Sequence, residues 1–189
     1  MNKGYRMIAL LIIDMQVGLF EGEPPRYDTE GVIRRINEIA TEVRATGGMV
    51  IFIQHEDNHS FIPGTRSWEI LPVLERKDAD LLVSKQACDA FYETELSDLL
   101  KQQNVRQVII TGCATDFCVD TTIRAAASRD YEVVVAGDAH TTKDRPHLDA
   151  ESIISHHNWM WKNLILPRNE VKILPATSVV EWLQLEAQE

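Results

Sequence analysis

Basic residues are scarce in this chain. Lys and Arg total 19 against 29 Asp and Glu, which gives a formal net charge of −10. Nucleic acids and anionic membrane surfaces attract basic patches, so this balance argues against both as partners. A single local lysine or arginine can still reverse the electrostatic field inside one pocket, so the net charge does not exclude an anionic small substrate.

Long apolar runs and paired cysteines are also missing from the sequence. The apolar run 7–13 ends at Asp14 and is too short for a signal peptide or a membrane span. Three cysteines are an odd number and suit reduced thiols rather than a disulfide framework. No G-x-G-x-x-G follows the first apolar run, which disfavours a nucleotide-binding protein. We therefore expect a cytoplasmic protein whose partner is a small molecule.

The sequence does contain short apolar runs that alternate with segments of helical spacing. Its 189 residues, 44% of them hydrophobic, suffice for one domain, expected to span 1–189. The alternation predicts an α/β fold, a parallel six-stranded, Rossmann-like sheet flanked by helices on both faces. Segments 17–29 and 55–72 are predicted loops. The predicted strands are 7–13, 49–53, 81–83, 107–111, 132–136 and 171–174, and the predicted helices are 31–46, 95–103, 119–129, 146–161 and 175–185.

Three chemically capable residues follow strands of this predicted sheet. Asp14 ends the first strand, Lys85 follows the third and Cys118 follows the fourth. The carboxyl ends of parallel strands share one edge, where ligands bind. Each residue alone has an ordinary explanation, as a turn cap, a solvated lysine or a small buried hydrophobe. Together they suit nucleophilic catalysis, with the carboxylate accepting the thiol proton and the ammonium stabilising the thiolate.

The position of Cys118 at a predicted helix start bears on its reactivity. Unpaired N–H groups and the positive end of the helix dipole lower a thiol pKa, so we expect a nucleophile rather than packing material. None of the six histidines is adjacent in sequence, and a Cys–His enzyme stays an alternative. Cys113 lies five positions before Cys118, which is not the spacing of a redox pair or a zinc site. Cys113 is interpreted as core and Cys88 as a bystander.

Three motifs give the chain a family resemblance. They are LLIIDMQ at 10–16, SKQACDAFYETEL at 84–96 and TGCATDFCVDTTIRAA at 111–126. With these motifs in this order, nearly the whole chain resembles the isochorismatase-like cysteine hydrolase superfamily, which includes nicotinamidases, carbamoyl-amide hydrolases and isochorismatases. The resemblance implies an isochorismatase-like sheet and assembly as a homo-oligomer with sites near subunit contacts.

The same resemblance implies roles for particular residues. The catalytic aspartate, lysine and nucleophile fall on Asp14, Lys85 and Cys118. An oxyanion hole is implied from the backbone N–H groups of Ala114 and Cys118, with a cis peptide bond between Cys113 and Ala114.

A metal site is a separate question. Nicotinamidases of this superfamily carry one aspartate and two histidines after the second strand, and QHEDNHSF stands there at 54–61. His55, Asp57 and His59 alternate and could face one way on an extended segment, where zinc could use them. Their order differs from the nicotinamidase pattern. We expect no obligatory metal and no cofactor, and a zinc site on these residues stays the alternative to a solvated polar loop.

The thiol favours acyl chemistry, because cleavage of the vinyl ether of isochorismate does not demand one. We predict a cysteine hydrolase that cleaves a small amide, carbamoyl or lactam-like C–N bond through a thioester. The alternatives are an isochorismatase-type ether hydrolase, a non-enzymatic small-ligand binding protein and a redox-sensing protein. Four aromatic residues near the motifs are candidates for lining the substrate pocket: Phe20, Trp68, Tyr92 and Phe117.

Overall fold

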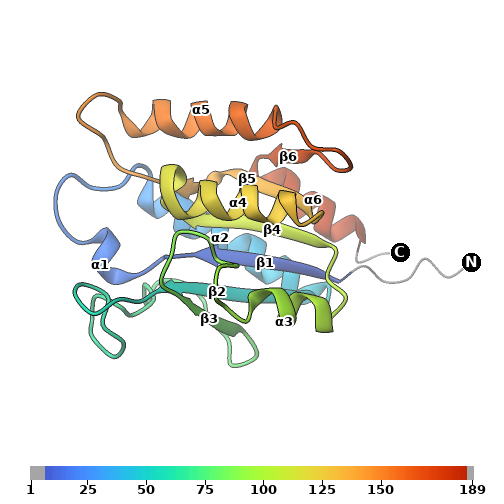
Figure 1. Ribbon diagram of the computed structural model, residues 1–189, viewed down its shortest axis with the longest axis horizontal. Helices are drawn as coiled ribbons and strands as arrows, with labels where there is room; N and C mark the ends of the chain where they lie inside the picture. Colours follow the sequence, from blue (N-terminus) through green and yellow to red (C-terminus); the bar gives the residue numbers. More distant parts are fainter. Residues whose placement is uncertain (1–6, 187–189) are drawn as a thin grey trace, which may run out of the picture.

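The computed structural model describes residues 7–186, and a six-stranded sheet runs through them (Figure 1). All neighbouring strands are parallel, in the order β3-β2-β1-β4-β5-β6. The sheet confirms the predicted fold class and all six predicted strands. The strands are β1 (Ile8–Ile13), β2 (Met49–His55), β3 (Leu81–Lys85), β4 (Gln107–Cys113), β5 (Glu132–Thr141) and β6 (Val171–Leu174).

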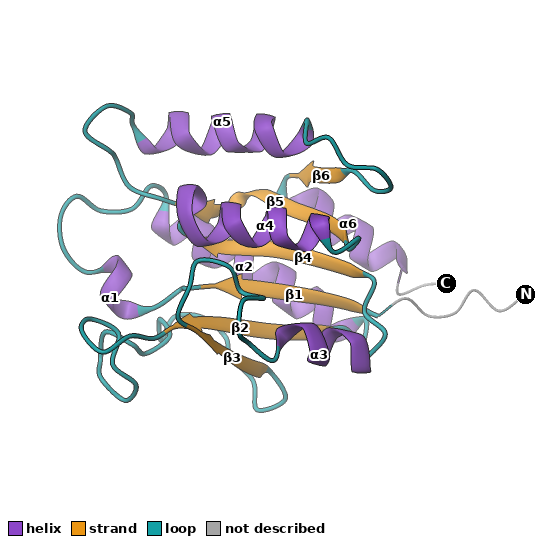
Figure 2. Ribbon diagram, in the orientation of Figure 1, coloured by secondary structure: helices purple, strands orange, loops and turns teal. Residues whose placement is uncertain are grey.

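Helices cover both faces of the sheet (Figure 2). None of the helices within 7–186 combines the length and apolar composition needed to cross a bilayer. The segment 17–29, predicted as a loop, begins with one helical turn, because Val17 and Gly18 donate N–H groups to a distant segment that the sequence pattern does not reveal. One face of the sheet carries α2 (Thr29–Ala45) and α6 (Ala176–Glu186). The other face carries α3 (Leu96–Gln102), α4 (Asp120–Ser128) and α5 (Ala150–Lys162). Two short helical turns, α1 (Val17–Phe20) and η1 (Thr115–Val119), follow β1 and β4.

Alternate residues of each central strand supply the two halves of the core. In β1, Leu11 and Ile13 pack with α3, α4 and α5, whereas Leu10 and Ile12 pack with α2 and α6. Every residue of β1 is buried, as its unbroken apolar run predicts. Burial of one such side chain contributes about 1.5–3 kcal/mol. The buried side chains of α2 recur at helical spacing and are Val32, Ile36, Ile39, Ala40 and Val43.

Strand β5 extends past the predicted end at residue 136 to Thr141. The β4–β5 register shifts between Ile110 and Gly112, and beyond the shift Gly112 pairs with His140 and Cys113 with Thr141. Gly137 therefore lies within a bulged strand instead of ending it. The bulge brings the end of β5 beside the end of β4, where Ala114 and η1 follow.

Gly112 marks a close approach of β4 to β1. Its φ is +113°, and a Cβ at this position would overlap the Ile13 carbonyl oxygen and lie 2.6 Å from the Ile13 nitrogen. Both neighbours are backbone atoms that cannot rotate away. Glycine is therefore required at this point, one residue before Asp14 on the neighbouring strand.

We predict that Gly112→Ala lowers the free energy of unfolding by about 4 kcal/mol or more, because backbone of β1 must move. The matched control is Gly64→Ala, since Gly64 also has a positive φ, of +85°, but no atom within 4 Å of the added Cβ. That control loses about 1 kcal/mol from the left-handed conformation alone. Urea unfolding measures both losses, and equal losses in the two variants would contradict the steric argument.

Candidate active site

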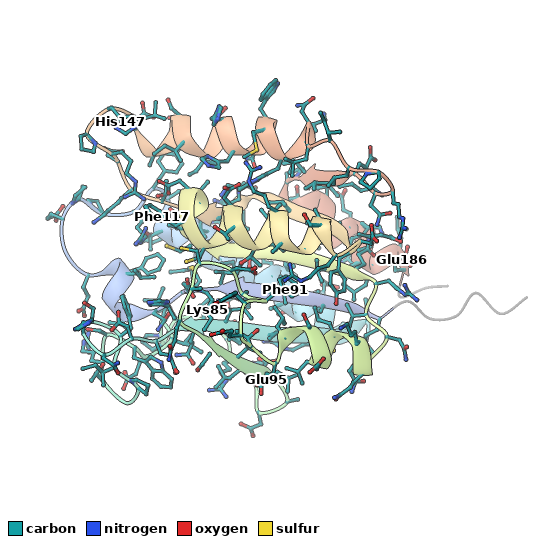
Figure 3. All side chains as sticks on the ribbon, in the orientation of Figure 1. Lys85, Phe91, Glu95, Phe117, His147 and Glu186 are labelled. Atoms are coloured by element: carbon teal, nitrogen blue, oxygen red, sulfur yellow. The ribbon has the colours of Figure 1, made fainter. Side chains whose placement is uncertain are left out.

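Asp14, Lys85 and Cys118 meet at the carboxyl edge of the sheet, as predicted. The Lys85 Nζ lies 2.7 Å from Asp14 Oδ2 and 3.3 Å from Cys118 Sγ. The side chains of Asp14 and Lys85 are buried, and Cys118 is half-buried. Figure 3 shows Lys85 and Phe117, the neighbour of Cys118, at the end of the sheet opposite Glu186. The buried ammonium at the end of β3 therefore contacts both a carboxylate that follows β1 and a thiol on η1.

A buried glutamine, Gln16, fixes the backbone around Asp14. Asp14 has a φ of 46° and donates its N–H to the Ile53 carbonyl at 2.9 Å. The Gln16 amide donates to the carbonyls of His55 and Trp68, both at 2.9 Å, and accepts the His55 N–H at 2.8 Å. It thus ties the end of β1 to the end of β2 and to the 55–72 loop. Gln16 closes the LLIIDMQ motif, and that was the only signal for it in the sequence.

The electrostatics of the cluster keep the thiol protonated. Burial raises the pKa of Cys118, and the negative charge of Asp14 raises it further, whereas Lys85 lowers it. This corrects the prediction of a lowered thiol pKa, because burial beside a carboxylate outweighs the partial charge of one helical turn. Burial lowers the pKa of Lys85, but Asp14 and Cys118 outweigh that effect and the pKa is raised. The lysine therefore stays an ammonium.

The cysteine stands on a π-helical turn, η1, that precedes α4. The Val119 N–H donates to the Ala114 carbonyl, five residues back, at 3.2 Å. Val119 is the first N–H donor in this i→i+5 pattern, so the pattern itself provides no acceptor for the N–H of Cys118, one residue earlier. The Cys113–Ala114 peptide bond is cis, and within 7–186 the Ala114 N–H has no hydrogen-bond acceptor. The Ala114 N–H is therefore a free backbone donor, among the described residues, directly before the turn that carries the thiol.

An ion pair holds η1 to the segment after β5. Asp116 accepts hydrogen bonds from Arg145 Nε at 2.8 Å, from Arg145 Nη2 at 3.0 Å and from Thr142 Oγ1 at 2.6 Å. Burial raises the pKa of Asp116, but these hydrogen bonds outweigh it and the pKa is lowered. The Arg145 guanidinium also lies 5.1 Å from the centre of the Phe117 ring. Arg145 therefore positions the turn that carries the cysteine.

A fully buried histidine supports the other side of η1. His140 Nδ1 lies 2.9 Å from Thr115 Oγ1, and its Nε2 lies 3.0 Å from Asn158 Oδ1. Asn158 uses its Nδ2 to donate to the Gly137 carbonyl, so its oxygen accepts from Nε2–H and Nδ1 accepts from Thr115. Burial lowers the pKa of His140 to about 4. This neutral imidazole supports the turn through Thr115 and makes no hydrogen bond to Cys118.

The histidine network weakens the Cys–His alternative. Among residues 7–186, Cys118 accepts a hydrogen bond from Lys85 and interacts with Asp14, and no histidine bonds to it. The role of His140 had no sequence signal, because its contacts arise from the β5 bulge and from α5.

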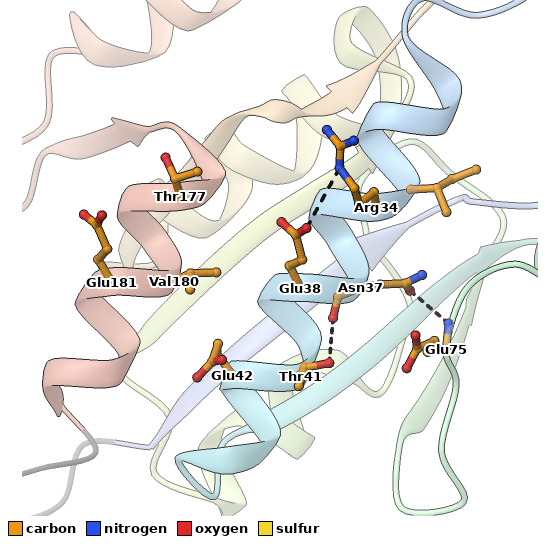
Figure 4. Close-up of a pocket in the computed structure, with 10 residues that line it drawn as sticks. Arg34, Asn37, Glu38, Thr41, Glu42, Glu75, Thr177, Val180 and Glu181 are labelled. Atoms are coloured by element: carbon orange, nitrogen blue, oxygen red, sulfur yellow. Dashed lines mark hydrogen bonds and ion pairs between the residues drawn. The ribbon is translucent and has the colours of Figure 1, made fainter.

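The four aromatic residues predicted to line the pocket differ in exposure. Phe117 and Tyr92 are exposed, whereas Phe20 and Trp68 are half-buried. A cavity of about 450 Å³ lies beside His140, and a groove of about 700 Å³ lies between α2 and α6 (Figure 4). Neither is lined by these aromatics, and the groove is on the face of the sheet opposite α4. Their role in substrate binding stays a prediction.

The candidate metal ligands instead organise a loop. Asp57 Oδ1 accepts the backbone N–H groups of His59, Ser60 and Phe61 at 2.7–2.9 Å. The hydrogen bond from Phe61 and then that from His59 lower the pKa of Asp57 to about 2. The His55 ring packs edge-on against Phe61, with ring centres 5.7 Å apart. Within the described part of the chain, no three His, Cys, Asp or Glu side chains are placed to hold a metal ion.

The family model described as the isochorismatase domain matches residues 8–156, so the chain belongs to the isochorismatase family. Streptothricin hydrolase of Streptomyces noursei is 31% identical over 73% of this chain, which spans just 56% of that hydrolase. Ureidoacrylate amidohydrolase of Stutzerimonas stutzeri (strain A1501) is 25% identical, with 69% of this chain and 68% of that protein covered. The crystal structure of an isochorismatase family protein matches with a TM-score of 0.82 and 34% identity, covering 88% of this chain and 97% of that one.

The charge balance around Cys118 predicts opposite effects of two substitutions. Asp14→Asn removes the charge that raises the thiol pKa, so iodoacetamide labels Cys118 faster at pH 7. Lys85→Met removes the charge that lowers the pKa, so labelling slows. We expect the two rates to differ by at least about tenfold. Peptide mass spectrometry measures them, exposed Cys88 serves as the internal control, and shifts in the same direction would contradict the arrangement.

Burial of neutral His140 predicts acid-sensitive stability. An unfolded histidine titrates near 6.5 and the folded one near 4, so the unfolded state binds more protons between these values. Stability therefore falls as the pH drops from 6.5 to 4, by about 3 kcal/mol from this residue.

Urea unfolding across this pH range measures the slope, which we expect to be shallower in His140→Gln. Substitution of the exposed His59 by glutamine is the control and keeps the wild-type slope. An unchanged slope in His140→Gln would show that other groups cause the acid sensitivity.

Proposed function

We propose that the protein is a cysteine hydrolase that cleaves a small amide, carbamoyl or lactam-like C–N bond through a thioester on Cys118. The observation that carries this proposal is the Lys85 ammonium, 2.7 Å from a carboxylate and 3.3 Å from a thiol in a buried cluster. A carboxylate base, a cation and a nucleophile in contact are the parts that covalent acyl transfer requires.

In the first half of the proposed reaction, Asp14 accepts the Cys118 proton as the sulfur attacks the substrate carbonyl. The Asp14 Oδ1 is buried and has no partner within residues 7–186, so an acceptor site is available for this proton. The C–S bond forms and the carbonyl π electrons move to oxygen. The Ala114 and Cys118 N–H groups stabilise that oxyanion.

The tetrahedral intermediate then collapses. The C–N bond breaks, protonated Asp14 gives its proton to the leaving nitrogen, and an amine or ammonia departs. In the second half, Asp14 accepts a proton from water as the water oxygen attacks the thioester. The C–S bond breaks, the sulfur regains a proton from Asp14, and the acid is released. Lys85 stays charged throughout and balances the negative charge that moves between oxygen and sulfur.

The raised pKa of Cys118 fits this sequence of steps. A thiol that stays protonated at rest resists adventitious oxidation and alkylation, because the thiolate is the reactive form. Its proton leaves as the new C–S bond forms, when the charge passes on to the carbonyl oxygen. The names of the streptothricin hydrolase and the ureidoacrylate amidohydrolase support a hydrolase, and the second supports an amide-type bond.

We predict that Cys118→Ala lowers kcat/KM on a hydrolysed amide by about 10³-fold or more, because the nucleophile is lost. Intact-mass measurement after incubation with an amide library detects the acyl adduct in the wild type. The matched control is Cys88→Ala, because Cys88 is an exposed cysteine. We expect the adduct to form in this control and to be absent from Cys118→Ala.

An ether hydrolase gives a different pattern. In that case Cys118→Ala retains much of the activity while Asp14→Asn loses it, and no acyl adduct forms. That result would replace the thioester mechanism.

A further inference from the structure

The loop between α1 and α2 carries an arginine, Arg26, that the proposed mechanism does not use. Its Nε donates to the Leu19 carbonyl at 2.6 Å, and its guanidinium carbon lies 5.3 Å from the centre of the Phe20 ring. These two contacts fix the plane of the guanidinium. The Nη1 atom is buried and has no hydrogen-bond partner within residues 7–186.

The charge of Arg26 is also unpaired. Nearby Arg35 pairs with Asp28, and Arg145 pairs with Asp116. Arg44 has an unpartnered Nη1 as well, but its charge is neutralised by Asp80 at 2.7 Å. No carboxylate of the described residues forms an ion pair with Arg26. A buried donor on an unpaired cation is unfavourable unless an acceptor meets it.

The segment that carries Arg26 is tied to the end of β5, which pairs with the end of β4. The next residue, Tyr27, donates its N–H to the Thr142 carbonyl at 2.9 Å and accepts the Thr141 hydroxyl at 2.6 Å. Thr141 is the register partner of Cys113, which precedes Ala114. Figure 1 shows the same approach, with the loop after α1 passing the end of β5.

The field of Arg26 reaches the end of β4. Burial raises the pKa of Cys113 to about 12, and Arg26 is the strongest influence against that rise. The guanidinium therefore acts electrostatically on the residue beside Ala114. In a chain with a net charge of −10, it supplies a local positive field at the site.

We propose that Arg26 is a specificity-determining residue that binds a carboxylate of the substrate, so that the preferred substrates are small amides bearing an anionic group. This inference rests on the proposed hydrolase function. Nε is occupied by the Leu19 carbonyl and Nη1 is buried, which leaves Nη2 to meet the carboxylate. A hydrogen bond from this charged group to a carboxylate is stronger than one between neutral groups. The reacting carbonyl then lies toward Ala114 and Cys118.

The test uses matched pairs of amides with and without a carboxylate: N-carbamoylglycine against its methyl ester, and succinamic acid against succinamide. We expect the wild type to prefer the acid of each pair. Arg26→Met lowers kcat/KM for the acid by about tenfold or more, mainly through KM, and changes the neutral partner less than about twofold. Arg26→Lys restores part of the loss because it keeps the charge.

The matched control is Arg66→Met. The Arg66 side chain is 79% exposed and pairs with Glu21, which lies on the same loop as Arg26. This substitution therefore removes one positive charge from the same region, but from a side chain that is not buried. It should leave the preference for the acid unchanged. Equal preference for the two members of each pair, or an equal effect of Arg26→Met on both, overturns the proposal.

A binding measurement separates this proposal from the proposed function. Calorimetric titration of the acids into Cys118→Ala needs no turnover, and Arg26→Met in that background should weaken binding by about tenfold or more. Arg26-dependent binding without any hydrolysis by the wild type supports the anion site and contradicts the hydrolase. Binding that is indifferent to Arg26 overturns the anion site whether or not hydrolysis occurs. A fall in melting temperature of more than about 5 °C in both Arg26→Met and Arg26→Lys assigns the residue a structural role instead.

Discussion

The arrangement of the site depends on one interaction, the contact of the buried Lys85 ammonium with both Asp14 and Cys118. A charge removed from water is tolerated only beside a partner, and the Asp14 carboxylate supplies it at 2.7 Å. Asp14 follows β1, Lys85 is the last residue of β3 and Cys118 lies after β4, so the contact requires these strands to end at one edge in the observed order. Gly112 contributes by allowing β4 to approach β1 just before Asp14.

The same contact sets the protonation state of the Cys118 thiol. Burial and Asp14 raise the pKa of Cys118 while Lys85 lowers it, so the proton stays on sulfur and next to its proposed acceptor. The elements around η1 hold this geometry without adding charge to it. His140 is neutral, and the charges of Asp116 and Arg145 cancel in their own pair. The proposed proton transfer thus runs between Asp14 and Cys118, directly beside the Lys85 ammonium.

The sheet and the meeting of Asp14, Lys85 and Cys118 were predictable, because unbroken apolar runs indicate buried parallel strands whose carboxyl ends share one edge. Features that depend on contacts between distant segments were not. The β5 bulge, and with it the contact of His140 with Thr115, follows from the register between two strands. The depth of Cys118 beside Asp14 also follows from packing. The argument from its position at a helix start therefore gave the wrong direction for its pKa.

Arg26 and Arg145 flank the end of β4 with identical chemistry, and their surroundings give them different roles. The Arg145 fork meets a carboxylate of η1 and rests on the Phe117 ring, so its hydrogen bonds serve the fold. The Arg26 guanidinium donates to one backbone carbonyl and lies over the Phe20 ring. These contacts orient the guanidinium but do not neutralise its charge. A fixed, unpaired cation is pre-organised for an anion, because little side-chain freedom remains to be lost on binding. In the anion site that we propose, this cation selects the small amides that reach Cys118 in a productive orientation.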